Sequence, residues 1–262
     1  MTKSTRRISA LVTGASRGIG RAIALVLALR GVRVAVHYQS NHIAARETLG
    51  KLAGRGHALF SADLADAAAT AALWGDVSET FGRIDLLVNN AGIYREHPPL
   101  AVGVEEWQDA WQSTLATNLL GPANLSLRAA QAMSSLPERR SRSWGRGRIV
   151  NISSRGAFRG EPDAPAYGAS KAALNSLSQS LAKALAPRGI YVYCLAPGWV
   201  ETEMAAAHLA GAAGAELLAQ HPQGRDAGPE EIAQAAAFCA LDAPAAMTGS
   251  IIDLNGASYL RT

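Results

Sequence analysis

The sequence has little cysteine and no long apolar run. Its 262 residues include two cysteines, Cys194 and Cys239. Two thiols cannot build a disulfide framework or a metal-ligand cluster, so we expect buried thiols in a reducing compartment and no metal site. No apolar run could span a bilayer, and the start MTKSTRRISALVTG lacks the apolar core of a signal peptide. These absences predict a cytoplasmic protein that does not enter membranes.

Strong charge and metal-ligand spacing are also missing. Charged residues form 18% of the chain and the net charge is +4, which suits anionic substrates or cofactors. The arginine-rich run from Leu136 to Arg148 is expected as an exposed loop. Its aromatic residues do not alternate with the arginines and no nucleic-acid-binding module is recognisable, so we expect no nucleic-acid partner. Trp107 and Trp111 are interpreted as helix packing or a subunit contact. The histidines lack metal spacing and are interpreted as surface or loop residues: His37, His42, His57, His97, His208 and His221.

Short β-branched runs alternate with longer helical segments along the chain. Strands are expected at 8–14, 32–38, 57–63, 83–92, 147–154, 190–198 and 249–256. Helices are expected at 19–31, 42–56, 67–82, 105–133, 167–189, 203–220 and 229–241. Such alternation, with nearly continuous apolar strands, predicts a parallel sheet covered on both faces. We therefore expect one α/β domain over 1–262, a doubly wound, Rossmann-like sheet of about seven strands.

A glycine-rich turn, TGASRGIG, joins the first strand to the first helix. Glycine allows a tight turn and a close approach of backbone to a pyrophosphate, and the helix beginning near Ile19 offers free N–H groups to that anion. The motif alone is weak, but its place between a strand and an amphipathic helix favours a dinucleotide site.

The residues after the second strand favour NADP(H) over NAD(H). An acidic residue there would bind the ribose 2′-hydroxyl of NAD, but HYQSN is followed by no acid before Glu47. Arg17 lies in the glycine turn instead, and a guanidinium matches phosphate oxygens. We therefore expect Arg17, Gln39, Ser40 and Asn41 to surround a 2′-phosphate. The alternative is that Arg17 faces solvent.

The stretch PAYGASKAAL places Tyr167 and Lys171 four residues apart, on one face of a helix. By themselves they could be neighbours on an exposed helix. They could also form a catalytic pair, in which the ammonium lowers the pKa of the phenol so that it can exchange a proton.

Several motifs decide between these alternatives because they occur in one order. The glycine turn is followed by Asp63, by NNAG at 89–92, by Asn118, by Ser154 ahead of the Tyr–Lys pair, and by PGWVET at 197–202. In this order, and over essentially the whole chain, the sequence resembles the short-chain dehydrogenase/reductase family. ASRGIG, GRIVNISS, PGWVETEM and NGASYL are most similar to its 3-oxoacyl-carrier-protein reductases.

The resemblance implies roles for individual residues. Asn118, Ser154, Tyr167 and Lys171 would form the catalytic tetrad: Tyr167 gives the proton, Ser154 holds the substrate oxygen, and Asn118 holds a water against Lys171. Ser154 is chosen over Ser153 because its distance from Tyr167 fits the family spacing. The implied cofactor-binding residues are Gly14, Ser16, Arg17, Gly18, Ile19, Gly20, Tyr38, Gln39, Ser40, Asn41, Asp63, Leu64, Asn90, Ala91, Gly92, Tyr167, Lys171, Pro197, Gly198, Val200 and Thr202.

The chain departs from the family pattern at two places. The loop from Leu136 to Arg148 is longer than usual, and Ala257 stands where a second glycine is common. The segment 203–225 is expected as a substrate lid, and its abundance of alanine and glycine favours an apolar or small substrate over a polyol.

Three functions remain open. The first is NADPH-dependent reduction of a 3-oxoacyl thioester in fatty-acid biosynthesis. The second is oxidation or reduction of another alcohol or ketone, such as a sugar, a steroid or a small carbonyl compound. The third is a non-enzymatic NADP(H)-binding sensor or scaffold, which the complete tetrad disfavours because a sensor needs no proton donor.

The resemblance also implies partners. The helices at 105–133 and 167–186 carry more apolar and small residues than one sheet face needs, so we expect a homotetramer that pairs them. A carrier protein would dock on the arginines Arg142, Arg146, Arg148 and Arg188, although Arg188 and the start of the fifth strand should lie opposite the ligand-binding edge of the sheet.

Overall fold

The computed structural model describes residues 7–137, 144–203 and 218–261. Its described strands form a single parallel sheet in the order β3-β2-β1-β4-β5-β6-β7. The chain runs outward from β1 to β3, crosses back to β4, and then runs outward to β7. This seven-stranded doubly wound sheet confirms the predicted fold class. The strands are β1 (Ser9–Val12), β2 (Arg33–Tyr38), β3 (Ala58–Ser61), β4 (Leu86–Asn89), β5 (Gly147–Ile152), β6 (Ile190–Pro197) and β7 (Ile251–Leu254).

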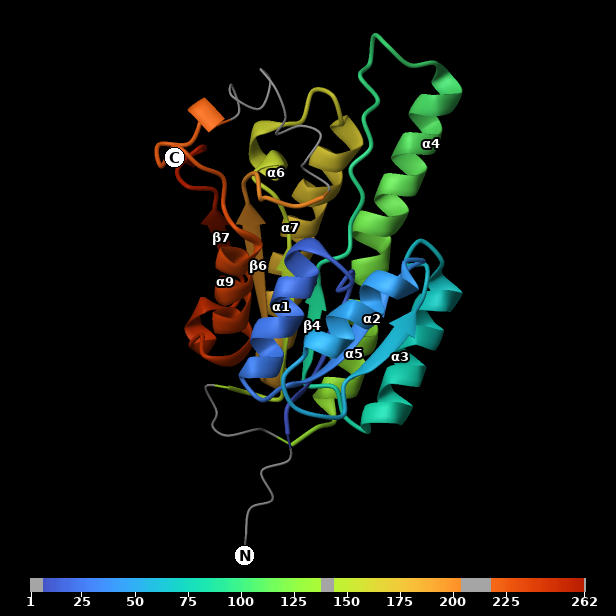
Figure 1. The fold of residues 1–262 in the computed structure, drawn as a ribbon, viewed down its shortest axis with the longest axis vertical. Helices are drawn as coiled ribbons and strands as arrows, with labels where there is room; N and C mark the ends of the chain where they lie inside the picture. The colour runs from blue at the N-terminus through green and yellow to red at the C-terminus, as the bar shows by residue number, and fades with distance from the viewer. Residues whose placement is uncertain (1–6, 138–143, 204–217, 262) are drawn as a thin grey trace, which may run out of the picture.

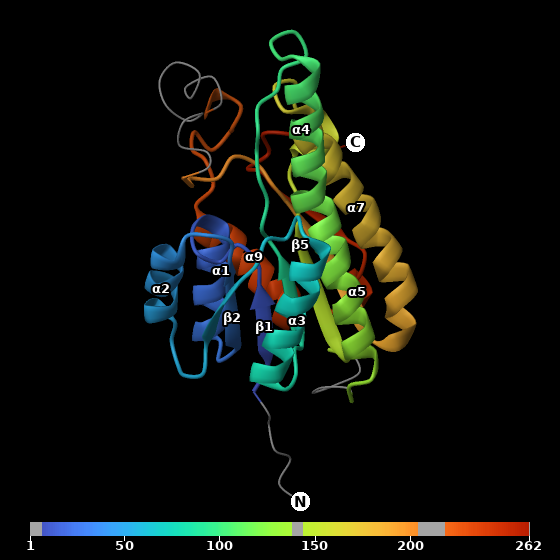
Figure 2. The same ribbon diagram turned by 90° about the vertical axis from the view of Figure 1, so that its right-hand side faces the viewer.

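Helices cover both faces of the sheet, as Figures 1 and 2 show. One face carries α1 (Gly18–Leu29), α2 (His42–Lys51) and α9 (Pro229–Leu241), and the other carries α3 (Ala67–Phe81), α5 (Gly121–Ser134) and α7 (Pro165–Leu185). Side chains alternate along each strand, so neighbouring residues enter different cores: Ala10 packs with α1 and α9, and Leu11 packs with α3 and α5. Within the described residues, no helix is both long and apolar enough to cross a membrane.

The helix expected over 105–133 is interrupted. Two α-helices, α4 (Val104–Leu115) and α5, are joined by a π-helical turn, η1 (Ala116–Leu120). A π-turn adds one residue to a helical repeat and often occurs at functional sites. Here it contains the fully buried Asn118. Helix α4, which precedes this turn in the chain, extends past the carboxyl ends of the strands and lies next to α7 (Figure 1).

Other elements differ from the sequence prediction at their ends. Helix α2 stops at Lys51, where Leu52 adopts an extended backbone, and Gly54 and Gly56 then turn with positive φ. A short helix, α6 (Gly156–Arg159), was not predicted and lies between Ser154 and Tyr167. The helix expected over 203–220 and most of the predicted lid fall outside the described residues. Ala257 adopts φ +62°, a region that favours glycine, where the family resemblance leads us to expect one.

Several side chains predicted at the surface are buried. Arg148 was expected in an exposed loop, but it is 1% exposed and donates from Nη1 to the carbonyl of Cys239 at 2.9 Å. It therefore cannot dock a carrier protein. His37 is buried in β2, which contradicts its assignment as a surface or loop residue, whereas His97 and His221 lie in loops, as predicted, although both are buried. Each ring of His37 and His97 bridges backbone groups from distant segments, so their burial is structural.

Candidate active site

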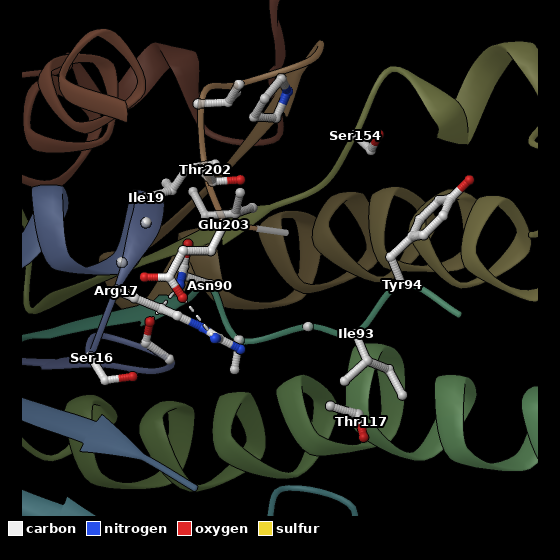
Figure 3. Close-up of a pocket in the computed structure, with 18 of the residues that line it drawn as sticks. Ser16, Arg17, Ile19, Asn90, Ile93, Tyr94, Thr117, Ser154, Thr202 and Glu203 are labelled. Carbon is white, nitrogen blue, oxygen red and sulfur yellow. Dashed lines mark hydrogen bonds and ion pairs between the residues drawn. The ribbon is translucent and has the colours of Figure 1, made fainter. Parts of the chain in front are cut away.

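A cleft of about 470 Å³ opens at the carboxyl ends of the strands. It spans the point where the chain reverses between β1 and β4, which is where ligands bind in doubly wound sheets. Every residue that the sequence predicted to bind the cofactor lines this cleft, together with Ser154. Figure 3 shows the glycine turn on one side of the cleft and Tyr94 and Ser154 on the other.

The glycine turn between β1 and α1 brings backbone into close contact. Gly14 adopts φ +62°, and a Cβ on Gly20 would lie 2.2 Å from the carbonyl oxygen of Gly14. A side chain is therefore excluded at Gly20, in the first turn of α1, whose free N–H groups lie at the cleft. This arrangement is a cradle for an anion, and it fits the pyrophosphate of a dinucleotide.

His37, on the neighbouring strand β2, holds this turn in place by a hydrogen bond. Its Nδ1 accepts a hydrogen bond from the Gly14 N–H at 3.1 Å, and its Nε2 lies 3.1 Å from the carbonyl oxygen of Ala62. These partners require a neutral ring with the proton on Nε2. Burial lowers the pKa of His37 to about 4, which keeps the ring neutral at physiological pH. Sequence reasoning missed this role, because no motif marks a histidine that accepts from a turn.

The region expected around a 2′-phosphate has partners of its own. Arg17 donates from Nη1 to Glu203 Oε2 at 2.9 Å across the cleft, and both side chains are exposed (Figure 3). The Asn41 side chain caps α2 by accepting from the Ala44 N–H at 3.0 Å. Arg17 therefore faces the cleft and can exchange Glu203 for a phosphate, whereas the Asn41 carbonyl oxygen is already used.

Tyr167 and Lys171 lie on the first turns of α7, next to the end of β5. Pro165 begins this helix, and His97 accepts a hydrogen bond from the Ala166 N–H at 3.2 Å. Lys171 donates from Nζ to the carbonyl of Ile152 at 2.9 Å, and its Nζ is 5.7 Å from the centre of the Tyr167 ring. The structure therefore brings phenol and ammonium together at the cleft, as the spacing predicted.

The electrostatics of the pair differ from the prediction. Burial raises the pKa of Tyr167 to about 12, and the hydrogen bond with Ser154 only partly opposes it. Burial also lowers the pKa of Lys171 to about 8. Desolvation thus outweighs the expected lowering of the phenol pKa by the ammonium. The phenol is held protonated at neutral pH, which is the form that donates a proton.

The two adjacent serines have different partners. Ser154 contacts Tyr167 and accepts a hydrogen bond from the Gly156 N–H at 3.0 Å. Ser153 donates to the carbonyl of Lys171 at 3.2 Å, so its hydroxyl holds α7 against β5. This geometry supports the assignment of Ser154, although both residues line the cleft.

Asn118 is the one predicted catalytic residue that does not line the cleft. Its Oδ1 accepts from the Ile93 N–H at 2.8 Å, and its Nδ2 donates to the Ile93 carbonyl at 2.9 Å. Thr117, one residue earlier, lines the cleft instead. A Cβ on Gly92 would lie 3.3 Å from Asn118 Oδ1 and 3.5 Å from Lys171 Nζ, so a glycine here lets these groups approach each other.

Further residues that we did not predict line the catalytic half of the cleft. Tyr94 packs edge-on against Tyr167, with ring centres 5.0 Å apart. Sequence reasoning missed Tyr94 because it follows the NNAG motif in a segment without regular structure. Over both halves of the cleft, the other lining residues that were not assigned to the site are His37, Ala62, Ile93, Thr117, Ile152, Ser153, Arg155, Glu161, Trp199 and Glu203.

Comparison with known proteins shows the family of the chain. A family described as Enoyl-(Acyl carrier protein) reductase matches residues 14–256 of the chain. The chain therefore belongs to the short-chain dehydrogenase/reductase family, and it is an oxidoreductase that uses a nicotinamide cofactor on a CH–OH or keto group.

Curated relatives match along nearly the whole chain. The 3-oxoacyl-(acyl-carrier-protein) reductase FabG of Escherichia coli (strain K12) is 39% identical over 251 residues, which cover 96% of this chain and 97% of the relative. The protein of the same name from Staphylococcus aureus (strain N315) is 39% identical over 254 residues, covering 96% and 98%. That from Salmonella typhi is 38% identical over 251 residues, covering 96% and 97%.

Proposed function

We propose that this protein is an NADPH-dependent reductase of 3-oxoacyl thioesters. The observation that carries the proposal is the pairing of a protonated phenol, Tyr167, with the Ser154 hydroxyl in a cleft that also holds a glycine turn suited to a pyrophosphate. The names of the relatives supply the substrate class.

The residues of the cleft divide the chemistry as follows. NADPH, when bound, supplies the hydride for the ketone carbon. Ser154 holds the ketone oxygen by a hydrogen bond, and Tyr167 gives that oxygen its proton. Lys171 donates to the Ile152 carbonyl and presents its charge beside Tyr167. When Tyr167 has lost its proton, this charge stabilises the tyrosinate until the proton is replaced.

The preference for NADPH is supported by charge at one end of the cleft. Arg17, Tyr38, Gln39 and Ser40 line that end, and no acidic residue follows β2 where an NAD ribose would need one. Glu203 pairs with Arg17 and competes with a 2′-phosphate. The pair is exposed, so breaking it costs little, on the order of 1 kcal/mol or less.

The experiment that tests the proposal is a substrate screen with each cofactor. Acetoacetyl thioesters, sugars and steroid ketones are offered with NADPH and with NADH, and cofactor oxidation is followed by absorbance. We expect the thioesters to give the highest kcat/KM, with NADPH preferred. Faster turnover of sugars or steroids would replace the thioester with another substrate, and NADPH binding without any turnover would favour a sensor.

Docking of an acyl carrier protein in the cytoplasm is the further part of the proposal. Arg188 is exposed at the end of α7, on the amino side of the sheet, so a docked carrier must reach around the helix to the cleft. A homotetramer pairing α4, α5 and α7 would bring subunit surfaces near that route. Light scattering should give a tetrameric mass at micromolar concentration, and a monomeric mass would contradict this part.

Charge reversal at Arg188 tests the docking surface. Arg188→Glu should raise KM for a carrier-bound acetoacetyl substrate several-fold, because exposed charges act mainly on association. A small acetoacetyl ester should keep its KM. Arg46→Glu, the same change at an exposed position on α2, is the control. An equal response of both substrates would remove Arg188 from the docking surface.

A further inference from the structure

The segment between Ser154 and Tyr167 forms a charged wall at the catalytic end of the cleft. It contains α6, and two of its residues, Arg155 and Glu161, line the cleft. The predicted preference for apolar substrates was drawn from the alanine-rich segment 203–225. This wall is polar, and it lies next to the residues that handle the ketone.

Most of the Glu161 side chain is covered by the protein, and one of its two carboxylate oxygens accepts no hydrogen bond from the described residues. Its side chain is 9% exposed, and its Oε2 accepts a hydrogen bond from Arg159 Nη2 at 3.2 Å. Its Oε1 accepts no hydrogen bond from the described part of the chain. This oxygen lies against Gly156, where an added Cβ would be only 2.2 Å away, so a side chain at 156 would displace the carboxylate.

Glu161 is close enough to the proton donor to act on it electrostatically. Its charge contributes to the raised pKa of Tyr167 and to that of Tyr94, while burial raises the pKa of Glu161 itself. The two phenol rings are in contact, and Tyr94 extends into the part of the cleft that contains Ser154 (Figure 3). A ketone held by Ser154 and Tyr167 would therefore extend past Glu161.

The other charged residue of the wall has its partners within the protein. Arg155 is 2% exposed, and it donates from Nη1 to Ser258 Oγ at 2.5 Å and from Nη2 to Gln220 Oε1 at 3.1 Å. These bonds fix the wall to the carboxyl-terminal segment. Glu161 differs, because it lines the cleft and its Oε1 has no donor among the described residues, so a bound molecule can supply one.

We infer that Glu161 Oε1 accepts a hydrogen bond from a neutral donor on the ketone substrate, a hydroxyl or an amide N–H. The inference rests on the proposed function, because it requires a ketone bound at Ser154 and Tyr167. Its consequence is specificity: ketones with such a donor are preferred over ketones of similar size without one. The donor can come from the amide of a thioester arm or from the hydroxyl of a free hydroxyketone.

Matched substrates test this inference and separate the two sources. The S-(2-acetoxyethyl) thioester of acetoacetate has no donor, whereas the N-acetylcysteamine thioester, of the same size, has an amide N–H in place of the ester oxygen. In the same way, 2-pentanone is matched with 4-hydroxy-2-butanone. With NADPH, the wild-type enzyme should show a kcat/KM about tenfold higher for a donor-bearing ketone than for its partner, the scale of one hydrogen bond. The pair that shows the preference identifies the source.

Variants at position 161 attribute the preference to the carboxylate. Glu161→Met keeps the length of the side chain and removes the acceptor, so the tenfold preference should disappear through a higher KM for the donor-bearing ketone. Glu161→Gln keeps an acceptor and should restore part of it. Asp163→Asn removes a charge at an exposed position two residues away and should keep the wild-type preference. NADPH fluorescence titration verifies that each variant is folded.

Three results would overturn the inference, and they differ from a failure of the proposed function. The first is equal turnover of matched ketones by the wild type, which needs no variant. The second is a preference that survives in Glu161→Met, and the third is its equal loss in Asp163→Asn. If the wild type binds NADPH and reduces none of these ketones or the screened thioesters, the proposed function itself is wrong and the inference falls with it.

Discussion

The two ends of the sheet both bury charged side chains, but they use them differently. At the amino end, Asp85 is fully buried, pairs with Arg83 and accepts a hydrogen bond from the Ser9 N–H at 3.0 Å. At the carboxyl end, Lys171 is buried and the Glu161 side chain is 9% exposed, yet both line a cleft.

This difference shows what burial of a charge indicates. A buried charge is costly unless the protein supplies its partners, and Asp85 has them, so it ties strands together. Around the cleft, the protein leaves positions for a ligand: the N–H groups of the glycine turn, the Tyr167 phenol and Glu161 Oε1. A buried charged side chain therefore indicates a ligand-binding site when it lines a cleft, and a structural role when all its partners belong to the protein.

The largest expected effect is a loss of catalysis at the carboxyl end, with the stability of the amino end unchanged. Tyr167→Phe removes one hydroxyl and keeps the ring, so turnover should fall by roughly 10²–10⁴-fold, the usual contribution of a general acid. NADPH affinity, measured by fluorescence, and stability to urea should remain near those of the wild type. Substantial residual turnover would show that another group gives the proton.

The next largest effect is a loss of stability at the amino end, with catalysis unchanged. Asp85→Asn leaves Arg83 with a buried, uncompensated charge, so the free energy of unfolding should fall by about 3–5 kcal/mol. Urea denaturation measures it, and kcat of the folded fraction should be unchanged. The control is Asp242→Asn, which breaks an exposed ion pair with Arg30 and should cost on the order of 1 kcal/mol or less. Similar losses for both variants would contradict the comparison.

Lowering the pH should destabilise the protein at the carboxyl end of the sheet, because His37 becomes protonated. Its folded pKa, about 4, lies below the ordinary value of 6.5, so the folded state favours the neutral ring. Its contribution is fully present above pH 6.5 and is lost as pH falls toward 4. At ~1.4 kcal/mol per pKa unit, about 3 kcal/mol of stability should disappear in this window.

A variant separates His37 from other acid-sensitive groups. His37→Gln keeps a neutral acceptor for the Gly14 N–H, so its stability should depend less on pH between 6.5 and 4. Urea unfolding at a series of pH values gives the slope for each protein. Parallel curves for the two proteins would mean that another group causes the acid loss.

The smallest expected effect is on the affinity of the cleft for NADPH relative to NADH. Arg17→Ala should weaken NADPH binding by ~1–3 kcal/mol, the range for a lost bond to a charged group, and leave NADH nearly unchanged. Glu203→Gln removes the competing carboxylate and should tighten NADPH binding slightly. Equal losses for both cofactors in Arg17→Ala would show that Arg17 does not contact the 2′-phosphate.

Sequence patterns predicted the fold and most of the cleft. The alternation of apolar strands with helices gave the number of strands and their parallel arrangement, and the glycine turn gave one wall of the cleft. They failed for groups whose role depends on distant partners. Asn118 lies in a π-turn, where its amide binds both backbone groups of Ile93, and His37 is buried beneath the glycine turn, where it accepts from the Gly14 N–H.

The sequence by itself determined the order of strands and helices, the glycine turn, and the spacing that puts Tyr167 and Lys171 on one helical face. These features are local, since they depend on periodicity and on the conformations that individual residues allow. Only the tertiary structure decided which charges are paired and which face the cleft. It placed Arg148 in the core and left Glu161 Oε1 without a donor, because burial and hydrogen bonding depend on segments that meet only after folding.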